Sequence, residues 1–165
     1  MKKPKALRPS GEEIEAFRRA CRERGIRVTP QRLEIFREIA KASDHPSAEE
    51  VHRRVKARLG SVSLDTVYRT LTTFEQWGLI SRVHFLEDRT RFDPNRTLHH
   101  HMFCTECKEI LDFHWADFDN AVLPAEVRGW CQPGSRHAQV RGICAKCRGK
   151  RSRRKMRGNR KRNGA

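Results

Sequence analysis

The chain has 165 residues and a formal net charge of +16, because 36 lysines and arginines outnumber 20 aspartates and glutamates. Hydrophobic residues make up 36% and charged residues 34%, which lies at the polar end of the globular range. No run of about 18 apolar residues could form a transmembrane helix, and the lysine-rich start lacks the apolar stretch of a secretory signal. These features predict a cytoplasmic protein of one or two small domains, without a membrane partner.

Start and stop signals divide the first half into four helices, expected at about 10–24, 30–42, 47–59 and 63–77. The first and third helices begin with capping boxes, at Ser10–Glu13 and Ser47–Glu50. The second begins with Thr29 as N-cap, followed by Pro30. Three glycines stand at expected helix ends: Gly25, Gly60 and Gly78. Apolar residues recur at three- and four-residue steps, so each helix should bury one face; in the fourth, that face is Leu64, Val67, Leu71, Phe74 and Trp77.

Two segments with strand-like composition, 79–85 and 90–93, flank an expected turn at 87–89 and predict a hairpin. Helices followed by a two-stranded ribbon are typical of a winged helix-turn-helix, which reads DNA with one helix in the major groove. The fourth helix carries Thr66, Tyr68 and Arg69 opposite its apolar face, and Arg27 precedes the second helix. Arg69 could donate to guanine, whereas Tyr68 could touch a thymine methyl group or a phosphate. The alternative is that Tyr68 is half-buried and the arginines only face water.

Six cysteines include two C-x-x-C pairs, Cys104/Cys107 and Cys144/Cys147. In a chain without an export signal, such pairs indicate a four-cysteine zinc site before disulfides. A redox motif or four unrelated thiols are the alternatives. Cys21 and Cys131 lack partners at ligand spacing and are expected to be packed or free.

The second half has short segments of strand-like composition at 99–104, 109–115 and 136–144, with a helix expected at 117–128. The predicted fold class is therefore α+β, with a winged-helix DNA-binding domain over residues 1–94 that ends in a hinge. A small zinc-stabilised α/β dimerisation domain over residues 95–147 follows. Because so few of its residues could build a core, metal and a partner subunit should supply its stability.

From Arg148 to Ala165 there are ten basic residues and no acidic one. Such a run is expected to be a disordered basic tail. It could hold phosphates without sequence preference, or it could only aid solubility. Since the rest of the chain is basic as well, we favour nucleic acid as the partner.

A second set of potential metal ligands surrounds the junction of the two halves: His45, Asp93, His99, His101 and Asp112. On a strand, His99 and His101 point to one side and His100 to the other. Imidazoles with carboxylates suit divalent iron, manganese or zinc, so one ion could tie the two domains together. The alternative is that the histidine run is only a polar strand.

This pattern resembles the ferric uptake regulator family of metal-dependent repressors, over about residues 13–147. The motifs that carry the resemblance are Gly25-x-Arg27-x-Thr29-Pro30-Gln31-Arg32, His45-Pro46-Ser47-Ala48-Glu49-Glu50-Val51, Ser63-Leu64-Asp65-Thr66-Val67-Tyr68-Arg69-Thr70-Leu71, Arg91-Phe92-Asp93, His99-x-His101-x-x-Cys104-x-x-Cys107, Ile110-x-Asp112-Phe113 and the second C-x-x-C. The resemblance implies a homodimer with a structural zinc on four cysteines. It also implies a regulatory Fe(II) or Mn(II) that switches on binding to an operator, expected to be an AT-rich palindrome.

Within this family, iron sensors usually place glutamate at one or both acidic positions of the regulatory site, whereas peroxide sensors place aspartate. Asp93 and Asp112 therefore make the chain similar to the peroxide-responsive repressors. In that subfamily, chemistry at the iron oxidises a ligand imidazole, here His45 or His99, and the dimer leaves DNA. Manganese would support DNA binding without this oxidation.

Several alternatives stay open. An iron-responsive regulator would use the same site only to gauge Fe(II) supply. A zinc hydrolase on His99, His101 and Asp112 lacks a general base at motif spacing, so we expect no enzyme, and a nucleoid protein would bind through the tail alone. The family's histidine eight residues before Cys144 is Arg136 here, with His137 one place along, which argues against a third metal site from residues such as His100, Asp119 and His137.

Overall fold

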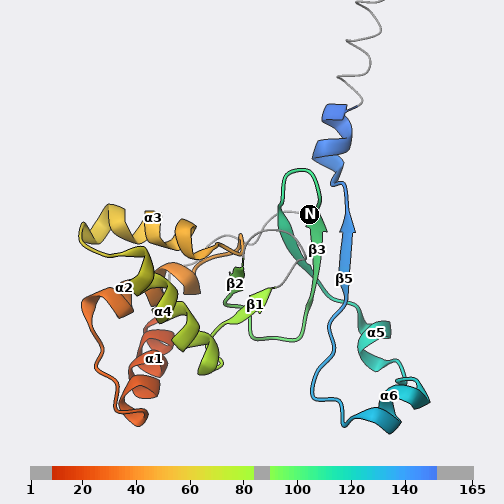
Figure 1. Cartoon of the computed structure of the whole chain (residues 1–165), viewed down its shortest axis with the longest axis horizontal. Helices are drawn as coiled ribbons and strands as arrows, with labels where there is room; N and C mark the ends of the chain where they lie inside the picture. Colours follow the sequence, from red (N-terminus) through yellow and green to blue (C-terminus); the bar gives the residue numbers. More distant parts are fainter. Residues whose placement is uncertain (1–8, 84–89, 152–165) are drawn as a thin grey trace, which may run out of the picture. The chain divides into compact units, whose positions relative to one another are not determined.

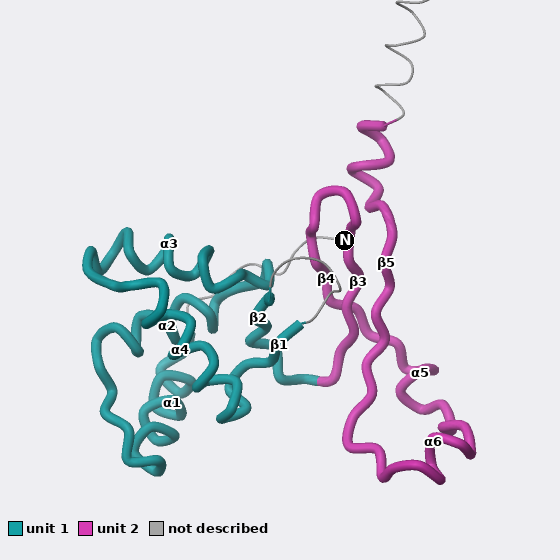
Figure 2. Tube along the Cα trace, viewed as in Figure 1, with its two compact units in different colours: residues 1–97 teal, residues 98–165 magenta. Residues whose placement is uncertain are grey.

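The computed structural model describes residues 9–83 and 90–151, and the chain divides into two compact units, residues 1–97 (unit 1) and 98–165 (unit 2; Figure 2). The sequence placed this boundary after residue 94. Two Asx turns follow β2, because the Asp93 carboxylate accepts from the Asn95 amide at 2.8 Å and the Asn95 side chain accepts from the Thr97 amide at 3.1 Å. In the described part of the chain, no helix is long and apolar enough to span a membrane.

Unit 1 begins with four helices at the predicted places: α1 (Gly11–Glu23), α2 (Pro30–Ala40), α3 (Ala48–Leu59) and α4 (Leu64–Gln76; Figure 1). Both expected capping boxes are formed, and the Thr29 hydroxyl accepts from the Arg32 amide. The three glycines expected at helix ends have positive φ values, of 64° at Gly25, 71° at Gly60 and 66° at Gly78. The local signals for these helices are therefore confirmed.

The core of unit 1 is aromatic and aliphatic. Phe17 of α1 stacks on Phe36 of α2 with ring centroids 4.4 Å apart, and both meet the edge of Phe74 on α4. Ile35 and Ile39 of α2 are fully buried beside them. The expected apolar face of α4 is correct except at its first residue, Leu64, which is 41% exposed because the helix starts there, outside the packed turns.

Strands β1 (Ser81–Val83) and β2 (Arg91–Asp93) follow α4 and pair antiparallel, with Arg82 opposite Phe92. The hairpin is thus confirmed, while its expected turn at 87–89 lies outside the described residues. Four helices and a two-stranded ribbon give unit 1 the winged-helix arrangement that the sequence predicted.

Unit 2 is a three-stranded sheet of β3 (His100–Cys104), β4 (Ile110–Phe113) and β5 (Gln139–Gly142). Figure 2 shows β3 between β4, its antiparallel neighbour, and β5, its parallel neighbour. The predicted single helix over 117–128 is wrong, since two short helices, α5 (Ala116–Asn120) and α6 (Ala125–Trp130), replace it. Ala121 turns to extended backbone, and Pro124 is the N-cap of α6 and lacks the N–H that a continuous helix would need there.

The end of unit 2 differs from its prediction too. Residues 145–151 are helical, so the first four residues of the expected disordered tail, 148–151, are ordered by the turn that starts at Cys144. The Arg148 amide donates to the Cys144 carbonyl at 3.0 Å. The remainder of the tail lies outside the described residues.

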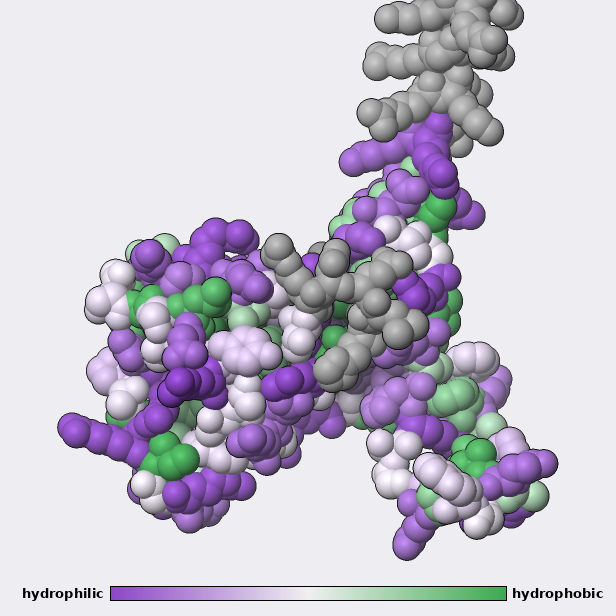
Figure 3. Space-filling model, viewed as in Figure 1, coloured by the Kyte–Doolittle hydropathy of each residue, from purple (hydrophilic) through white to green (hydrophobic). Residues whose placement is uncertain are grey.

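Unit 2 buries little apolar surface. Among its described residues, the buried hydrophobic side chains are Phe103, Cys104 and Ile110. Large apolar side chains are exposed instead: Trp115, Val122, Val127, Trp130 and Val140. Apolar atoms accordingly appear at the surface around α5 and α6 in Figure 3. This composition fits the expectation that other groups must stabilise unit 2.

Candidate metal centres and nucleic-acid interface

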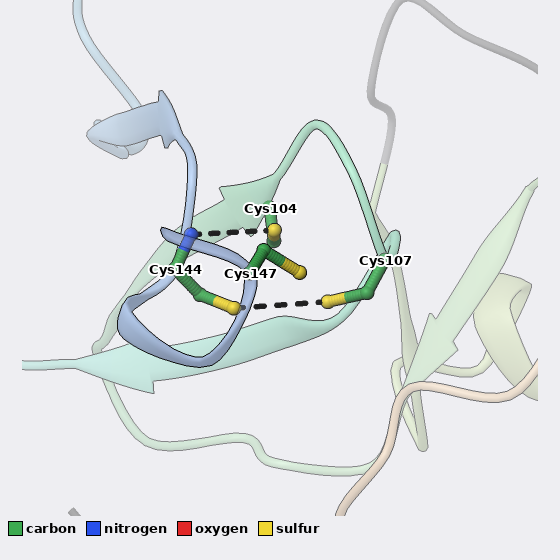
Figure 4. Close-up of side chains that lie close together, drawn as sticks. All are labelled: Cys104, Cys107, Cys144 and Cys147. Atoms are coloured by element: carbon green, nitrogen blue, oxygen red, sulfur yellow. Dashed lines mark hydrogen bonds between the residues drawn. The ribbon is translucent and has the colours of Figure 1, made fainter. Parts of the chain in front are cut away.

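The four cysteines of the two C-x-x-C pairs converge at one end of the sheet (Figure 4). Their sulfurs all lie within 4.8 Å of one another, and the Cys107 and Cys144 sulfurs are 3.9 Å apart. Tetrahedral zinc with Zn–S bonds of about 2.3 Å places sulfurs about 3.8 Å apart, so the cluster has the dimensions of a zinc site. Cys21, buried in the core of unit 1, and Cys131, at the end of α6, lie outside it.

The electrostatics of the cluster also suit a cation. Burial alone would raise the pKa of the Cys104 thiol, yet the backbone amides of Cys144, Cys107 and Glu106 donate to it and lower that pKa to about 6. The neighbouring Cys144 sulfur raises the pKa of Cys147 to about 12. Cys104 therefore loses its proton readily, whereas the charge and hydrogen bonds of the neighbouring sulfurs oppose deprotonation of Cys147. A bound divalent cation would stabilise all four thiolates together.

Unit 2 also brings together three side chains that could bind a metal ion through nitrogen or oxygen. His99 and His101 are buried, and their Nε2 atoms lie 3.0 Å apart. Two ligands at adjacent octahedral positions, with metal–nitrogen bonds of about 2.1 Å, would be about 3.0 Å apart. Asp112 faces His101 across the β3–β4 pair, with carboxylate oxygens 3.8 Å from His101 Nε2 and 4.0 Å from His99 Nε2. We call these three residues the unit 2 ligand set.

His100 points to the opposite side of β3, as the strand alternation predicted. Its Nδ1 accepts from the Ala138 amide at 3.2 Å, and its Nε2 lies 3.2 Å from Asp119 Oδ1. The third residue considered for another metal site, His137, places its Nδ1 3.3 Å from the His99 carbonyl oxygen. Hydrogen bonds of Ala138 and His137 thus hold the segment before β5 on β3, whereas Asp119 of α5 lies within ion-pair distance of His100.

Unit 1 holds the other two expected ligands, His45 and Asp93, which we call the unit 1 ligand set. Both are buried, with 3% and 1% of their surface exposed, and His45 Nε2 lies 3.8 Å from Asp93 Oδ2. His45 precedes α3 and has a φ of 49°, a region that few residues other than glycine adopt. Asp93 ends β2.

The residues that hold His45 in place were not found from the sequence. The amide of Phe92 donates to the Pro46 carbonyl at 3.0 Å, and Ser47 bridges to Arg91, so β2 runs beside the segment after His45. Arg54 of α3 binds Asp44, whose carboxylate raises the pKa of the guanidinium. Spacing cannot reveal such contacts, because the residues that meet lie ten to 46 positions apart along the chain.

The residues expected to contact DNA lie on the surface of unit 1. Tyr68 is 45% exposed, and the Arg69 side chain is 80% exposed with its Nε 3.0 Å from the Asp65 carboxylate. Arg27 is exposed as well. Thr66 is half-buried, and its hydroxyl lies 2.8 Å from that of Ser63, the N-cap of α4, so it also supports the helix start.

Comparison with known proteins places these features in a family. The model of the ferric uptake regulator family matches residues 23–126. The peroxide-responsive repressor of Staphylococcus epidermidis is 28% identical to this chain, over 82% of this chain and 90% of that protein. The peroxide operon regulator of Bacillus subtilis is also 28% identical, over 84% of this chain and 95% of that protein.

Solved structures show the same fold. The ferric uptake regulator of Helicobacter pylori matches 86% of this chain and 97% of its own with a TM-score of 0.74 at 22% identity. That of Vibrio cholerae matches 78% of this chain and 99% of its own with a TM-score of 0.62 at 26% identity. The α+β class, with a winged-helix N-terminal unit and a cysteine-clustered C-terminal unit, is thereby confirmed, and the chain belongs to the ferric uptake regulator family.

Proposed function

We propose that this chain is a metal-dependent, DNA-binding transcriptional repressor that acts as a homodimer and senses peroxide. Zinc on the four cysteines would stabilise unit 2, and one regulatory Fe(II) or Mn(II) would be shared by the unit 1 and unit 2 ligand sets. Two similar proteins are named for a response to peroxide. The chemistry of the two ligand sets supports the same function.

The observation that carries the proposal is that both acidic ligands are aspartates beside buried histidines. Asp93 lies 3.8 Å from His45, and Asp112 lies 3.8 Å from His101. Three imidazoles and two carboxylates suit Fe(II) and Mn(II), and a short carboxylate that binds through one oxygen leaves a position open to peroxide. Fe(II) bound there would supply the Fenton chemistry that oxidises a ligand imidazole.

The residues of the chain would turn this chemistry into a switch. His45 belongs to the DNA-binding unit and His99 to the other unit, so an ion shared between the sets favours one arrangement of the two. Oxidation of either imidazole removes its ligand nitrogen and with it the preference for that arrangement. The dimer then releases its operator.

Two surface features support the DNA and dimer parts of the proposal. α4 exposes Tyr68 and Arg69 as a recognition helix would, and the operator is expected to be an AT-rich palindrome that matches a two-fold dimer. In unit 2, β5 forms one edge of the sheet and exposes Val140 on that strand. A second copy that covers this edge would supply apolar contacts that unit 2 lacks.

The experiment that tests this function is operator binding titrated with Fe(II) or Mn(II), followed by low peroxide. We expect both metals to promote binding. Peroxide should release only the Fe(II) form and add oxygen to peptides that contain His45 or His99, as read by mass spectrometry. If the Fe(II) form keeps its operator and neither peptide gains oxygen, the peroxide response is refuted and the iron-responsive regulator replaces it.

Two rivals from other classes are tested with the same material. A zinc hydrolase would show metal-dependent turnover of an ester or phosphodiester, whereas we expect none. A nucleoid protein acting through its basic tail would bind every sequence equally, with or without Mn(II). We expect deletion of residues 148–165 to weaken binding to all DNA alike while the preference for the operator remains. A cytoplasmic location stays a prediction.

A further inference from the structure

The segment that carries His45 is held from two sides. His45 has a φ of 49°, so its backbone stays in this conformation only where neighbouring contacts fix it. On one side, Arg91 Nη1 donates to Glu50 Oε2 at 2.6 Å and to the His45 carbonyl oxygen at 3.4 Å. These contacts tie the segment to β2, the strand that ends in Asp93.

On the other side, Arg54 of α3 binds the residue directly before His45. Its two terminal nitrogens donate to the two oxygens of Asp44, at 3.3 and 2.5 Å, which is the two-pronged geometry that fixes both partners. Arg54 Nη1 also lies 3.7 Å from Glu38 Oε1, and the Glu38 side chain is 2% exposed. Asp44 is therefore fastened to a guanidinium that a buried carboxylate holds on the body of unit 1.

A neighbouring arginine, Arg58, allows the Arg54–Asp44 contact to be distinguished from the ion pairs on Glu38. Arg58, one turn further along α3, binds the same buried Glu38 and also Glu34, and no contact in the described residues joins it to Asp44. Loss of Arg58 and loss of Arg54 should therefore both weaken the packing of α3 against α2. Only loss of Arg54 should also free the segment before His45.

We propose that Arg54 is a positioning residue for the regulatory ion, which acts through Asp44 to hold the His45 imidazole in the place where it binds metal. This inference rests on the proposed function, in which His45 is a ligand. Contacts behind a ligand commonly change metal affinity by about 10- to 100-fold, because a ligand that must be reordered binds more weakly. The same contact couples the metal-bound state of His45 to α3 of the DNA-binding unit.

The test is Mn(II) affinity, read from the electron paramagnetic resonance signal of free Mn(II), on the full chain loaded with zinc. We expect Arg54→Ala and Asp44→Ala each to weaken Mn(II) binding about 10-fold or more. The double variant should be no weaker than either single one, because both remove the same contact. The matched controls are Arg58→Ala, which disturbs Glu38 without touching Asp44, and Arg53→Ala, which removes an exposed charge from the same helix.

The controls decide between a positioning role and a structural one. Both control variants should bind Mn(II) within about two-fold of the unchanged protein, and zinc content should be the same throughout. If Arg58→Ala weakens Mn(II) binding as much as Arg54→Ala, or if Asp44→Ala leaves it unchanged, the inference is overturned. Should Arg54→Ala fail to fold, Asp44→Ala carries the test, since it keeps Arg54 beside Glu38. If the unchanged protein and its His45→Ala variant bind Mn(II) equally, the proposed function itself has failed.

Discussion

The two units of this chain are stabilised by different means. Unit 1 packs four phenylalanines, Phe17, Phe36, Phe74 and Phe92, and a set of fully buried aliphatic residues into one core. Of the largest fully buried side chains in the described residues, the one that belongs to unit 2 is the polar His100. Apolar residues of unit 2 such as Val122 and Trp130 are instead more than 80% exposed. Unit 1 therefore has an apolar core of its own, whereas unit 2 must draw on groups that come from outside the chain.

That difference assigns separate tasks to the two units. A core of close-packed apolar side chains is insensitive to metal supply, which suits a unit that must always present the same recognition helix. A unit with four clustered cysteines and few buried apolar residues folds only as far as metal and partner allow. A regulator built in this way could gain or lose a regulatory ion at its two ligand sets while the apolar core behind its DNA-reading surface stays intact.

Removal of the structural zinc should have the largest effect and should be confined to unit 2. Cys104→Ser is expected to lose zinc, unfold unit 2 and dissociate the dimer, because structural zinc contributes on the order of 10 kcal/mol in small metal-dependent domains. Zinc release and gel filtration measure both effects. Cys131→Ser, outside the cluster, is the control and should retain zinc. A Cys104→Ser variant that stays a dimer and keeps its zinc would contradict the claim that zinc on the four cysteines stabilises unit 2.

The next largest effect should be confined to unit 1. Phe17→Ala removes the ring that stacks on Phe36 and meets Phe74, and should destabilise unit 1 by about 3–5 kcal/mol. Denaturant unfolding followed by hydrogen exchange of α1 and α4 would show it, with zinc content as the internal control. Loss of zinc in this variant would mean that the stability of unit 2 depends on the core of unit 1.

A smaller effect is expected on DNA binding without a change in fold. Arg69→Ala should cost about 1–3 kcal/mol at one base-pair position of the operator, because an exposed guanidinium on a recognition helix reads guanine. Binding to single-substitution operators measures it, and the melting temperature serves as the control. Equal loss on all sequences would show that Arg69 contacts phosphate instead.

The smallest expected effect is on stability, at two glycines that differ in backbone conformation but have equal space for a side chain. Gly60 ends α3 at a φ of 71°, and a Cβ there would meet nothing within 4 Å, so Gly60→Ala should cost roughly 1–2 kcal/mol through strain alone. Gly129, inside α6, has equal space without a positive φ, and Gly129→Ala should be neutral or slightly stabilising. Thermal unfolding of the two variants checks the contrast, and similar shifts would contradict it.

The sequence predicted best the features that local chemistry decides. The caps at Ser10, Thr29 and Ser47 placed the helices of unit 1, because each cap depends on residues a few positions apart. The C-x-x-C spacing identified the members of the cysteine cluster, although Cys107 and Cys144 of its two pairs lie 37 positions apart. The prediction of one helix over 117–128 was wrong because Pro124 interrupts the helical hydrogen bonds, and the apolar pattern around it was too weak to indicate two short helices.

Contacts between distant residues could not be predicted in the same way. The run of three histidines indicated which side of β3 each imidazole takes, since that follows from the strand period alone. The positive φ of His45 and its supports at Arg54 and Arg91 depend on how α3 and β2 pack, over separations of ten and 46 residues. The buried Glu38 was missed for the same reason, because only the folded helices bring Arg54 and Arg58 to it.

The central claim is that one regulatory ion needs ligands from both units. Its most direct test is Mn(II) stoichiometry and affinity for the zinc-loaded chain, for Asp93→Asn in unit 1 and for Asp112→Asn in unit 2. We predict one regulatory Mn(II) per chain, lost or strongly weakened by either substitution, with operator binding lost in parallel. If either variant keeps the affinity of the unchanged protein, or if two independent ions bind and each substitution removes only one, the account is contradicted.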